Sequence, residues 1–289
     1  MLAIFKREFK SFFNGVIGWI FIAFLLLFVG IFVYVLNLLS GYASFENTIS
    51  NIWFLNFFIV AIPLLTMRSF AEERNTKSDQ LLYSLPLSVG QIVLGKYLAM
   101  LAVFAIPVLI IAFYPFVLSA FGYMAYKSAY LAILGFFALG AALIALGMFI
   151  SSLTESQVIA AIVGYGSMFL MSMMYIFVNT IPSDAFISLI LLIVAAIIVA
   201  AIAYLMTKNY YVALGVFGVL TLCLVVFYFI SPSSFEGLFG NILSYLALFD
   251  RFTDLTGGIF DVSAIVYLIS FAAFFVYLTV QAVEKRRWS

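Results

Sequence analysis

The stretch Ser88–Tyr97, SVGQIVLGKY, comes close to a phosphate-binding loop. Gly90, Gly95 and Lys96 have the spacing at which a glycine-rich loop presents backbone N–H groups and a lysine ammonium to nucleotide phosphates. The pattern also requires Ser or Thr after the lysine, because that hydroxyl ligates Mg²⁺, and Tyr97 stands there instead. The sequence therefore raises the question of whether this chain binds ATP.

The residues around the motif favour a different interpretation. A phosphate loop follows a buried strand and opens a helix at its lysine end, whereas here Ser-Leu-Pro-Leu-Ser precedes Gly90. Ser88 and Gln91 form a capping-box pattern, which predicts that a helix begins before the glycines. An apolar stretch follows Lys96, whose ammonium is expected to reach from the membrane boundary into the cytoplasm. We therefore interpret the motif as the start of a membrane helix.

The composition identifies lipid as the solvent of this chain. Of its 289 residues, 67% are hydrophobic and 9% charged, whereas soluble domains carry about 25% charged residues. Histidine is absent and there is one cysteine, which removes imidazole catalysis, the usual zinc ligands and any internal disulfide. The basic residues are dispersed, with no pattern of a nucleic-acid-binding module. We predict no catalytic residue, no metal site and no nucleic-acid partner.

The elements that position the motif are predicted to be membrane helices, each needing roughly 20 apolar residues. Stretches of suitable length without Asp, Glu, Lys or Arg lie at about 16–39, 52–67, 97–119, 129–150, 157–179, 185–207, 211–230 and 262–283. The fold class is therefore an all-α polytopic membrane protein with about eight transmembrane helices. We predict a single transmembrane domain over residues 1–289.

The distribution of positive charge predicts the orientation. With the N-terminus in the cytoplasm, all of the 13 lysines and arginines except Lys127 and Arg251 lie inside. The opposite orientation would reverse this bias, so the positive-inside rule places both termini in the cytoplasm.

Two segments outside the spans are expected to lie along the membrane surface. In residues 1–14, Leu2, Phe5, Phe9 and Phe12 fall on one helical face and basic residues on the other, which predicts a flat interfacial helix. The alternative is a basic flank that only fixes topology. In the external segment 231–261, apolar residues recur at intervals of three and four and predict a short amphipathic helix; they are Phe235, Leu238, Phe239, Ile242, Leu243, Leu246 and Phe249.

Polar chemistry is sparse within the predicted spans. No charged residue lies near the centre of any span, which argues against a proton relay. Energy for any uphill movement would therefore have to come from a partner. Several glycines would allow close helix approach, either within the chain or across a dimer seam; they are Gly135, Gly140, Gly147, Gly164 and Gly166.

The cytoplasmic segment 68–96 carries the densest charge. Arg68, Glu72, Glu73 and Arg74 predict a charged helical extension of the second span. Ser78 can cap a further short helix with Asp79 in its first turn, and the sequence Leu85-Pro86 ends it.

Two segments resemble the ABC-2 type permeases, the membrane subunits of ATP-driven exporters, and look closest to the gliding-motility-associated permeases. TMRSFAEERNTKSDQLLYSLPLSVGQIVLGKYLA is similar to the family pattern T-M-R-x-F-A-E-E, E-L-L-x-x-x-P-x-S and V-L-G-K-Y. The C-terminal GGIFD segment, final span and RRW ending also fit, as does the opening MLAIFKREFKSFF. The chain departs from the family at Gln80, which is usually Glu, and at Lys77, which is usually Gly. It also has more spans than the family's usual six, with 185–230 resembling an insertion.

The resemblance implies that the segment after the second span contains a coupling helix that docks on a separate ATP-binding subunit. The residues it assigns to this coupling are Arg68, Glu72, Glu73, Arg74, Asp79, Gln80, Leu81, Leu82, Pro86 and Ser88. ATP and Mg²⁺ would then be bound by the partner, with no cofactor and no enzyme activity on this chain. A second permease copy or homologue, an external-domain subunit and membrane lipid are further expected partners, in a prokaryotic cell membrane.

Three functions remain open at this point. The first is the permease subunit of an ABC exporter. The second keeps the ATPase but converts its work into mechanical action on an external partner, without transport. The third is a membrane scaffold without an ATPase. Nothing in the sequence specifies the substrate.

Overall fold

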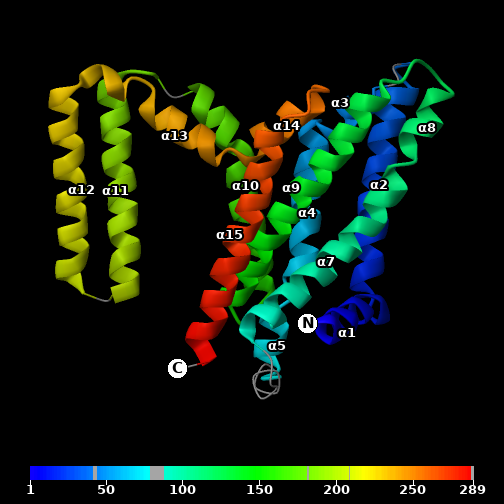
Figure 1. The fold of residues 1–289 in the computed structure, drawn as a ribbon, viewed down its shortest axis with the longest axis horizontal. Coiled ribbons are helices and arrows are strands. Elements are labelled where there is room, and N and C mark those ends of the chain that lie inside the picture. The colour runs from blue at the N-terminus through cyan, green and yellow to red at the C-terminus, as the bar shows by residue number, and fades with distance from the viewer. Residues whose placement is uncertain (42–43, 79–87, 181, 208, 288–289) are drawn as a thin grey trace. The chain divides into compact units, whose positions relative to one another are not determined.

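The computed structural model describes residues 1–41, 44–78, 88–180, 182–207 and 209–287. These residues form helices and no strand, which confirms the all-α class. They divide into two compact units (Figure 1). The first comprises Met1–Ser172 with Leu248–Ser289, and the second comprises Met173–Ala247. The prediction of one permease domain over 1–289 stays a prediction.

The first unit contains a bundle of long apolar helices. They are α2 (Ile17–Val33, continued by a π-helical turn Tyr34–Leu38), α4 (Ile52–Thr66), α7 (Val89–Ile111), α9 (Tyr126–Leu153), α15 (Val262–Arg287) and the first part of α10 (Gln157–Thr180). Short helices connect or cover them: α3 (Phe45–Ile49), α5 (Ala71–Asn75), α8 (Tyr114–Ser119) and α14 (Leu248–Thr256). The predicted boundaries of these spans agree with the helices within a few residues, except that α7 begins well before residue 97.

Helix α9 forms the centre of this bundle, and small residues let its neighbours approach it. A Cβ on Gly140 would lie 2.2 Å from the ring of Phe104 in α7, and one on Gly147 would lie 2.3 Å from the hydroxyl of Thr66 in α4. Gly135 is in close contact with Leu255 of α14. These three glycines therefore serve packing within the chain. Gly166, by contrast, has nothing within 4 Å of its Cβ position.

The second unit is built on a helical hairpin of α11 (Ala185–Thr207) and α12 (Tyr210–Ile230), which lie side by side in Figure 1. A 3₁₀ turn, η2 (Pro232–Phe235), and α13 (Leu238–Leu246) follow and pack on α11. Across the described residues, seven helices are long and apolar enough to cross a membrane, and the apolar stretch Ala185–Ile197 of α11 is shorter than the others. The structure therefore has the polytopic helical architecture predicted from the sequence.

The external segment differs from the single amphipathic helix predicted for it. It forms η2, α13 and α14, with the chain leaving helical geometry at Ala247 between the last two. Phe249 is buried within α14, whose Phe252 and Leu255 pack against Gly135. Of the predicted apolar stripe, Leu238 to Leu246 form α13, whereas Phe249 continues into α14, whose apolar side faces α9 at Gly135.

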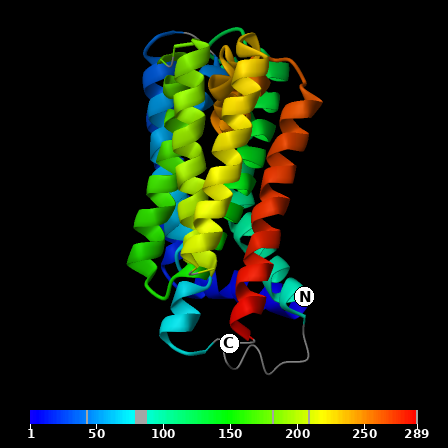
Figure 2. The same cartoon turned by 90° about the vertical axis from the view of Figure 1, so that its left-hand side faces the viewer.

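Helix α1 (Leu2–Asn14) confirms the predicted helix near the N-terminus. It runs crosswise to α2 (Figure 1), and lies at the same end of the first unit as α5 and the C-terminal end of α15 (Figure 2). Its predicted apolar face is incomplete, because Leu2 is largely exposed while Ile4 is buried against α7. The helix thus packs on protein, and its aromatic side chains Phe9, Phe12 and Phe13 are partly buried. Its position on a membrane surface stays a prediction.

Candidate functional site

The charged segment after α4 is held on α9 by a single buried hydroxyl. Ser151 Oγ accepts hydrogen bonds from the backbone N–H groups of Phe70 and Ala71, both at 3.2 Å, and donates to the carbonyl of Met67 at 3.0 Å. The two N–H groups belong to the start of α5, where a helix has no internal acceptors. Ser151 is fully buried, so this side chain of α9 determines where α5 begins.

The lysine of the glycine-rich motif lies inside the protein. Lys96 was expected to extend its ammonium into the cytoplasm, but its side chain is only 2% exposed. Its Nζ donates to the Ser69 carbonyl and to Glu73 Oε1, both at 2.8 Å, and lies 5.2 Å from the centre of the Phe70 ring. The expectation was wrong because α5 folds back over α7 and covers the lysine with its own carboxylate and aromatic ring.

Helix α1 contributes a second carboxylate to the same lysine. Glu8 Oε1 lies 3.3 Å from Lys96 Nζ, and Arg7 pairs with Glu8 at 2.5 Å and with Glu73 at 3.2 Å. Burial opposes ionisation of Glu8, but the ammonium of Lys96 and the guanidinium of Arg7 outweigh it, so the pKa of Glu8 is lowered. The two cations and two anions form a charge-balanced network joining α1, α5 and α7.

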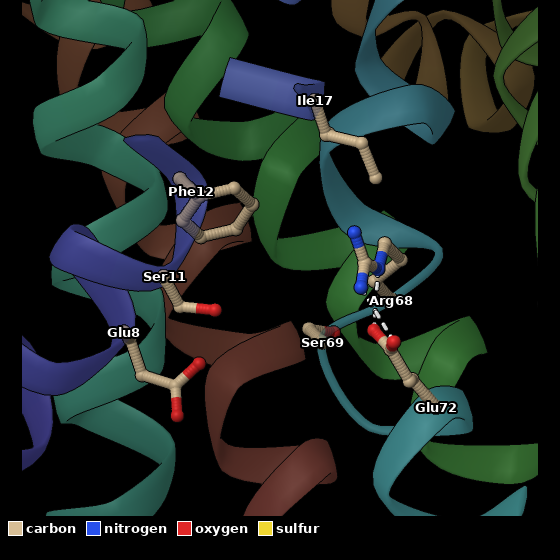
Figure 3. Close-up of a pocket in the computed structure, with 7 residues that line it drawn as sticks. All are labelled: Glu8, Ser11, Phe12, Ile17, Arg68, Ser69 and Glu72. Atoms are coloured by element: carbon tan, nitrogen blue, oxygen red, sulfur yellow. Dashed lines mark hydrogen bonds and ion pairs between the residues drawn. The ribbon is translucent and has the colours of Figure 1, made fainter. Parts of the chain in front are cut away.

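A further ion pair lies on the opposite side of a cleft from Glu8. Arg68 and Glu72 pair through both oxygens of the carboxylate, four residues apart, while Glu8 extends from α1 on the other side (Figure 3). The pocket drawn there is also lined by Ser11, Phe12, Ile17 and Ser69. A second cleft, of about 370 Å³, shares some of these residues and is lined by Arg7, Glu8, Ser11, Arg68, Glu72, Glu73, Thr76, Ser78 and Lys96. Because Arg68 and Glu72 are each about one third exposed, this pair is accessible to a partner, unlike Lys96.

Of the two glycines in the motif, only Gly95 has a packing role. A Cβ on Gly95 would lie 3.0 Å from the side chain of Ile4, whereas Gly90 has nothing within 4 Å. Ser88 Oγ accepts from the Gln91 N–H at 3.4 Å and caps α7, as the capping-box pattern predicted. Gly95 therefore allows α1 to approach α7 closely enough for Glu8 to reach Lys96. The side of the motif that carries Gly95 and Lys96 is in contact with α1.

The end of α5 shows why glycine would suit position 77, where this chain has lysine. The Ser78 N–H bonds the Glu73 carbonyl at 2.9 Å and the Lys77 N–H bonds the Arg74 carbonyl at 3.0 Å, the pairing of a Schellman motif, whose C′ residue is left-handed. Lys77 occupies that position with φ +54°. Glycine adopts this conformation without steric cost, which is a physical reason for the glycine usual in the family.

We expect Lys77→Gly to stabilise the end of α5. Removing the Cβ from a left-handed residue relieves a cost of about 1 kcal/mol, offset in part by the greater freedom of glycine in the unfolded chain. Hydrogen exchange of the Lys77 and Ser78 amides should slow in the variant. Lys77→Ala is the matched control, because it removes the same charge but keeps the Cβ; equal protection in both variants would contradict the assignment.

The structure places part of the predicted coupling set. Arg68, Glu72, Glu73 and Ser88 lie at one end of the first unit as described, and Arg74 is buried in α5. Asp79, Gln80, Leu81, Leu82 and Pro86 lie outside the described residues. Glu8 and Ser151 are not among the residues predicted from the sequence, and Lys96 is predicted only as a snorkelling lysine. Glu8 could have been found as the acidic residue among the basic ones of the first helix; Ser151 carries no local signal.

The helical bundle defines a multi-pass membrane protein with a charged surface attached to its second and third spans. The family model described as ABC-2 family transporter protein matches residues 2–185. No curated protein and no solved structure gave a significant match. The chain belongs to the ABC-2 transporter family and is a membrane permease subunit of that type. The match does not distinguish the gliding-motility-associated permeases within the family.

Family membership has direct consequences for the ATP question. A permease of this family is a transmembrane subunit that associates with an ABC ATP-binding subunit. The matched region contains the α1, α5 and α7 segments that meet at Lys96. The ammonium of Lys96 is surrounded by Glu8, Glu73 and the Ser69 carbonyl, all from this chain.

Proposed function

We propose that this chain is the permease subunit of an ATP-driven exporter in a prokaryotic cell membrane. ATP hydrolysis on a separate subunit acts on the cytoplasmic segment after α4, and the spans respond by rigid-body rearrangement. The observation that carries the proposal is the attachment of α5 to the bundle. Ser151 fixes its start to α9, and Glu73 fixes its middle to α7 and α1 through Lys96.

This attachment suits a segment that transmits force. A loop held only by solvent contacts would absorb a displacement, whereas α5 is joined to three helices: by a buried hydrogen bond to Ser151 of α9, by the Lys96 pair to α7 and by a more exposed pair to Arg7 of α1. Displacing α5 therefore displaces α7 and α9, which pack on each other and carry the fully buried rings of Phe104 and Phe136. Of the proposed coupling residues, Arg68 and Glu72 remain accessible to the ATPase, while Glu73 acts through the position of α5.

The experiment is reconstitution of the chain with its ATP-binding subunit in liposomes. We expect the ATPase activity of the complex to exceed that of the isolated ATP-binding subunit. Leu81→Asp together with Leu82→Asp should remove this stimulation, because charges would replace the apolar residues proposed to dock on the ATPase. Lys127→Ala, predicted to lie on the external side, is the control. Stimulation that survives the double substitution would contradict the coupling assignment.

An ATPase complex could also perform mechanical work on an external partner. That alternative shares the coupling site, so ATPase stimulation in liposomes does not separate the two, and the fate of cargo in cells does. Substrate accumulation that follows deletion of the permease and ATPase together supports the exporter. An intact cargo distribution with loss of an external partner's activity supports mechanical work.

A further inference from the structure

The buried lysine of the glycine-rich motif has no role in nucleotide binding and requires another explanation. Lys96 is among the largest fully buried side chains of the described residues, in company that is otherwise apolar. Burying an ammonium is costly unless it is paired and hydrogen-bonded. A methionine would fill similar space in the helix without that cost, so bundle packing alone does not account for a lysine here.

The partners of Lys96 come from two segments that are distant in the sequence. Glu73 lies in α5, beyond the second span, and Glu8 lies in α1, before the first span. Each carboxylate is largely buried, with 18% and 16% of its side chain exposed. Lys96 itself lies in the first turns of α7. One ammonium therefore bridges the interfacial helix and the segment proposed to face the ATPase.

The surrounding contacts hold this bridge in one geometry. Arg7 pairs with the same two carboxylates, so each carboxylate contacts two cations. Ile4 packs against Gly95, one residue before the lysine, at a distance that a larger residue would not permit. Helix α1 is thus fixed to α7 at adjacent positions by one apolar and one ionic contact.

We infer that Lys96 is a positioning residue that makes α1 and α5 move as one body with the start of the third span. The inference rests on the proposed function, since the motion it transmits is the one that the ATPase imposes. The interfacial helix then becomes part of the coupling device, and its displacement along the membrane surface accompanies each ATPase cycle.

The test uses the full complex with its ATP-binding subunit, in a Cys223→Ser background. Spin labels at Lys6→Cys and Asn75→Cys, both exposed positions on α1 and α5, report the distance between the helices. In the unsubstituted network we expect a narrow distance distribution that is retained when MgATP and vanadate are added. Lys96→Met should broaden it and lower the stimulated kcat on the order of tenfold. The KM for ATP should not change, because the nucleotide lies on the other subunit.

Matched variants make the outcome decisive. Lys10→Met makes the same substitution at an exposed lysine of α1, and should leave both the distribution and kcat unchanged. Glu8→Gln weakens only the arm to α1, and serves if Lys96→Met fails to fold; it should broaden the distribution as well. A narrow distribution in Lys96→Met, or in Glu8→Gln where that variant replaces it, would overturn the inference. If the unsubstituted complex shows no stimulation, the proposed function fails, while the distance distributions still decide the role of Lys96.

Discussion

Replacing Glu73 with lysine is expected to unfold the end of the first unit that carries α1 and α5. The substitution places a third cation beside Lys96 and Arg7, which lie 2.8 and 3.2 Å from the Glu73 carboxylate. Breaking a buried pair leaves an uncompensated charge, and costs about 3–5 kcal/mol. We expect a loss of at least this size in the free energy of unfolding, with increased amide exchange in α1.

Glu72→Lys provides the control for this prediction. It makes the same charge reversal one residue away, at a side chain that is about one third exposed and pairs with Arg68. An exposed pair contributes about 1 kcal/mol or less, so the stability of Glu72→Lys should remain near that of the unsubstituted chain. Thermal unfolding of both purified proteins in detergent measures the difference. Equal losses in the two variants would show that the ion network does not hold α1 and α5.

A double-mutant cycle shows whether the loss arises from the pair itself. Glu73→Gln, Lys96→Met and the combined variant should reveal a coupling of ~0.5–3 kcal/mol, the range for residues in one network. Additive effects would mean that each residue acts through separate contacts. The cycle measures the stability of the chain without its ATP-binding subunit, so it does not depend on how the chain is coupled to ATP hydrolysis.

The spans could be predicted because their physical cause is local. Twenty apolar residues in succession can satisfy their backbone in lipid only as a helix, so the ranges around α4, α9 and α12 follow from composition. The cap at Ser88 is equally local, since the hydroxyl oxygen and the N–H that donates to it are three residues apart. The structure confirms these features because no distant contact is needed to form them.

The network at Lys96 could not be predicted because its members come from three helices. In the sequence, Lys96 adjoins an apolar span and has the surroundings of a snorkelling lysine. Only the fold brings Glu8 and Glu73 to it, and only the missing side chain of Gly95 lets α1 approach. The Ser151 hydroxyl presents the same difficulty, because a serine near a helix end has many local uses and the N–H groups that donate to it lie about 80 residues away.

The external segment shows a different limit of periodicity. Residues at intervals of three and four predict an apolar face, yet the spacing does not say whether lipid or protein covers it. In α14 the cover is α9, where Gly135 leaves room for Phe252 and Leu255. Gly135 of α9 leaves the space that Phe252 and Leu255 of α14 fill. Nothing in the sequence pairs the glycine with these two residues.

Gly140→Ala, a substitution in the central helix α9, is expected to destabilise the first unit strongly. The new Cβ would lie 2.2 Å from Phe104 Cε1 and 2.4 Å from Cζ, well inside van der Waals contact. The ring has little room to withdraw, because Phe104 is fully buried and contacts the rings of Phe58, Phe136 and Phe137. Overpacking of this kind costs about 1–3 kcal/mol and occasionally more.

Gly166→Ala is the matched control, because it makes the same substitution in a membrane-length helix where nothing lies within 4 Å of the Cβ position. There the better helix propensity of alanine should leave stability unchanged or raise it by up to ~1 kcal/mol. The free energy of unfolding in detergent should therefore fall in Gly140→Ala and stay unchanged or rise in Gly166→Ala. If Gly140→Ala were as stable as Gly166→Ala, α7 would have to lie further from α9 than this structure places it. A second variant, Gly140→Ala with Phe104→Leu, should recover part of the loss, because the smaller side chain removes the ring that the new methyl group meets.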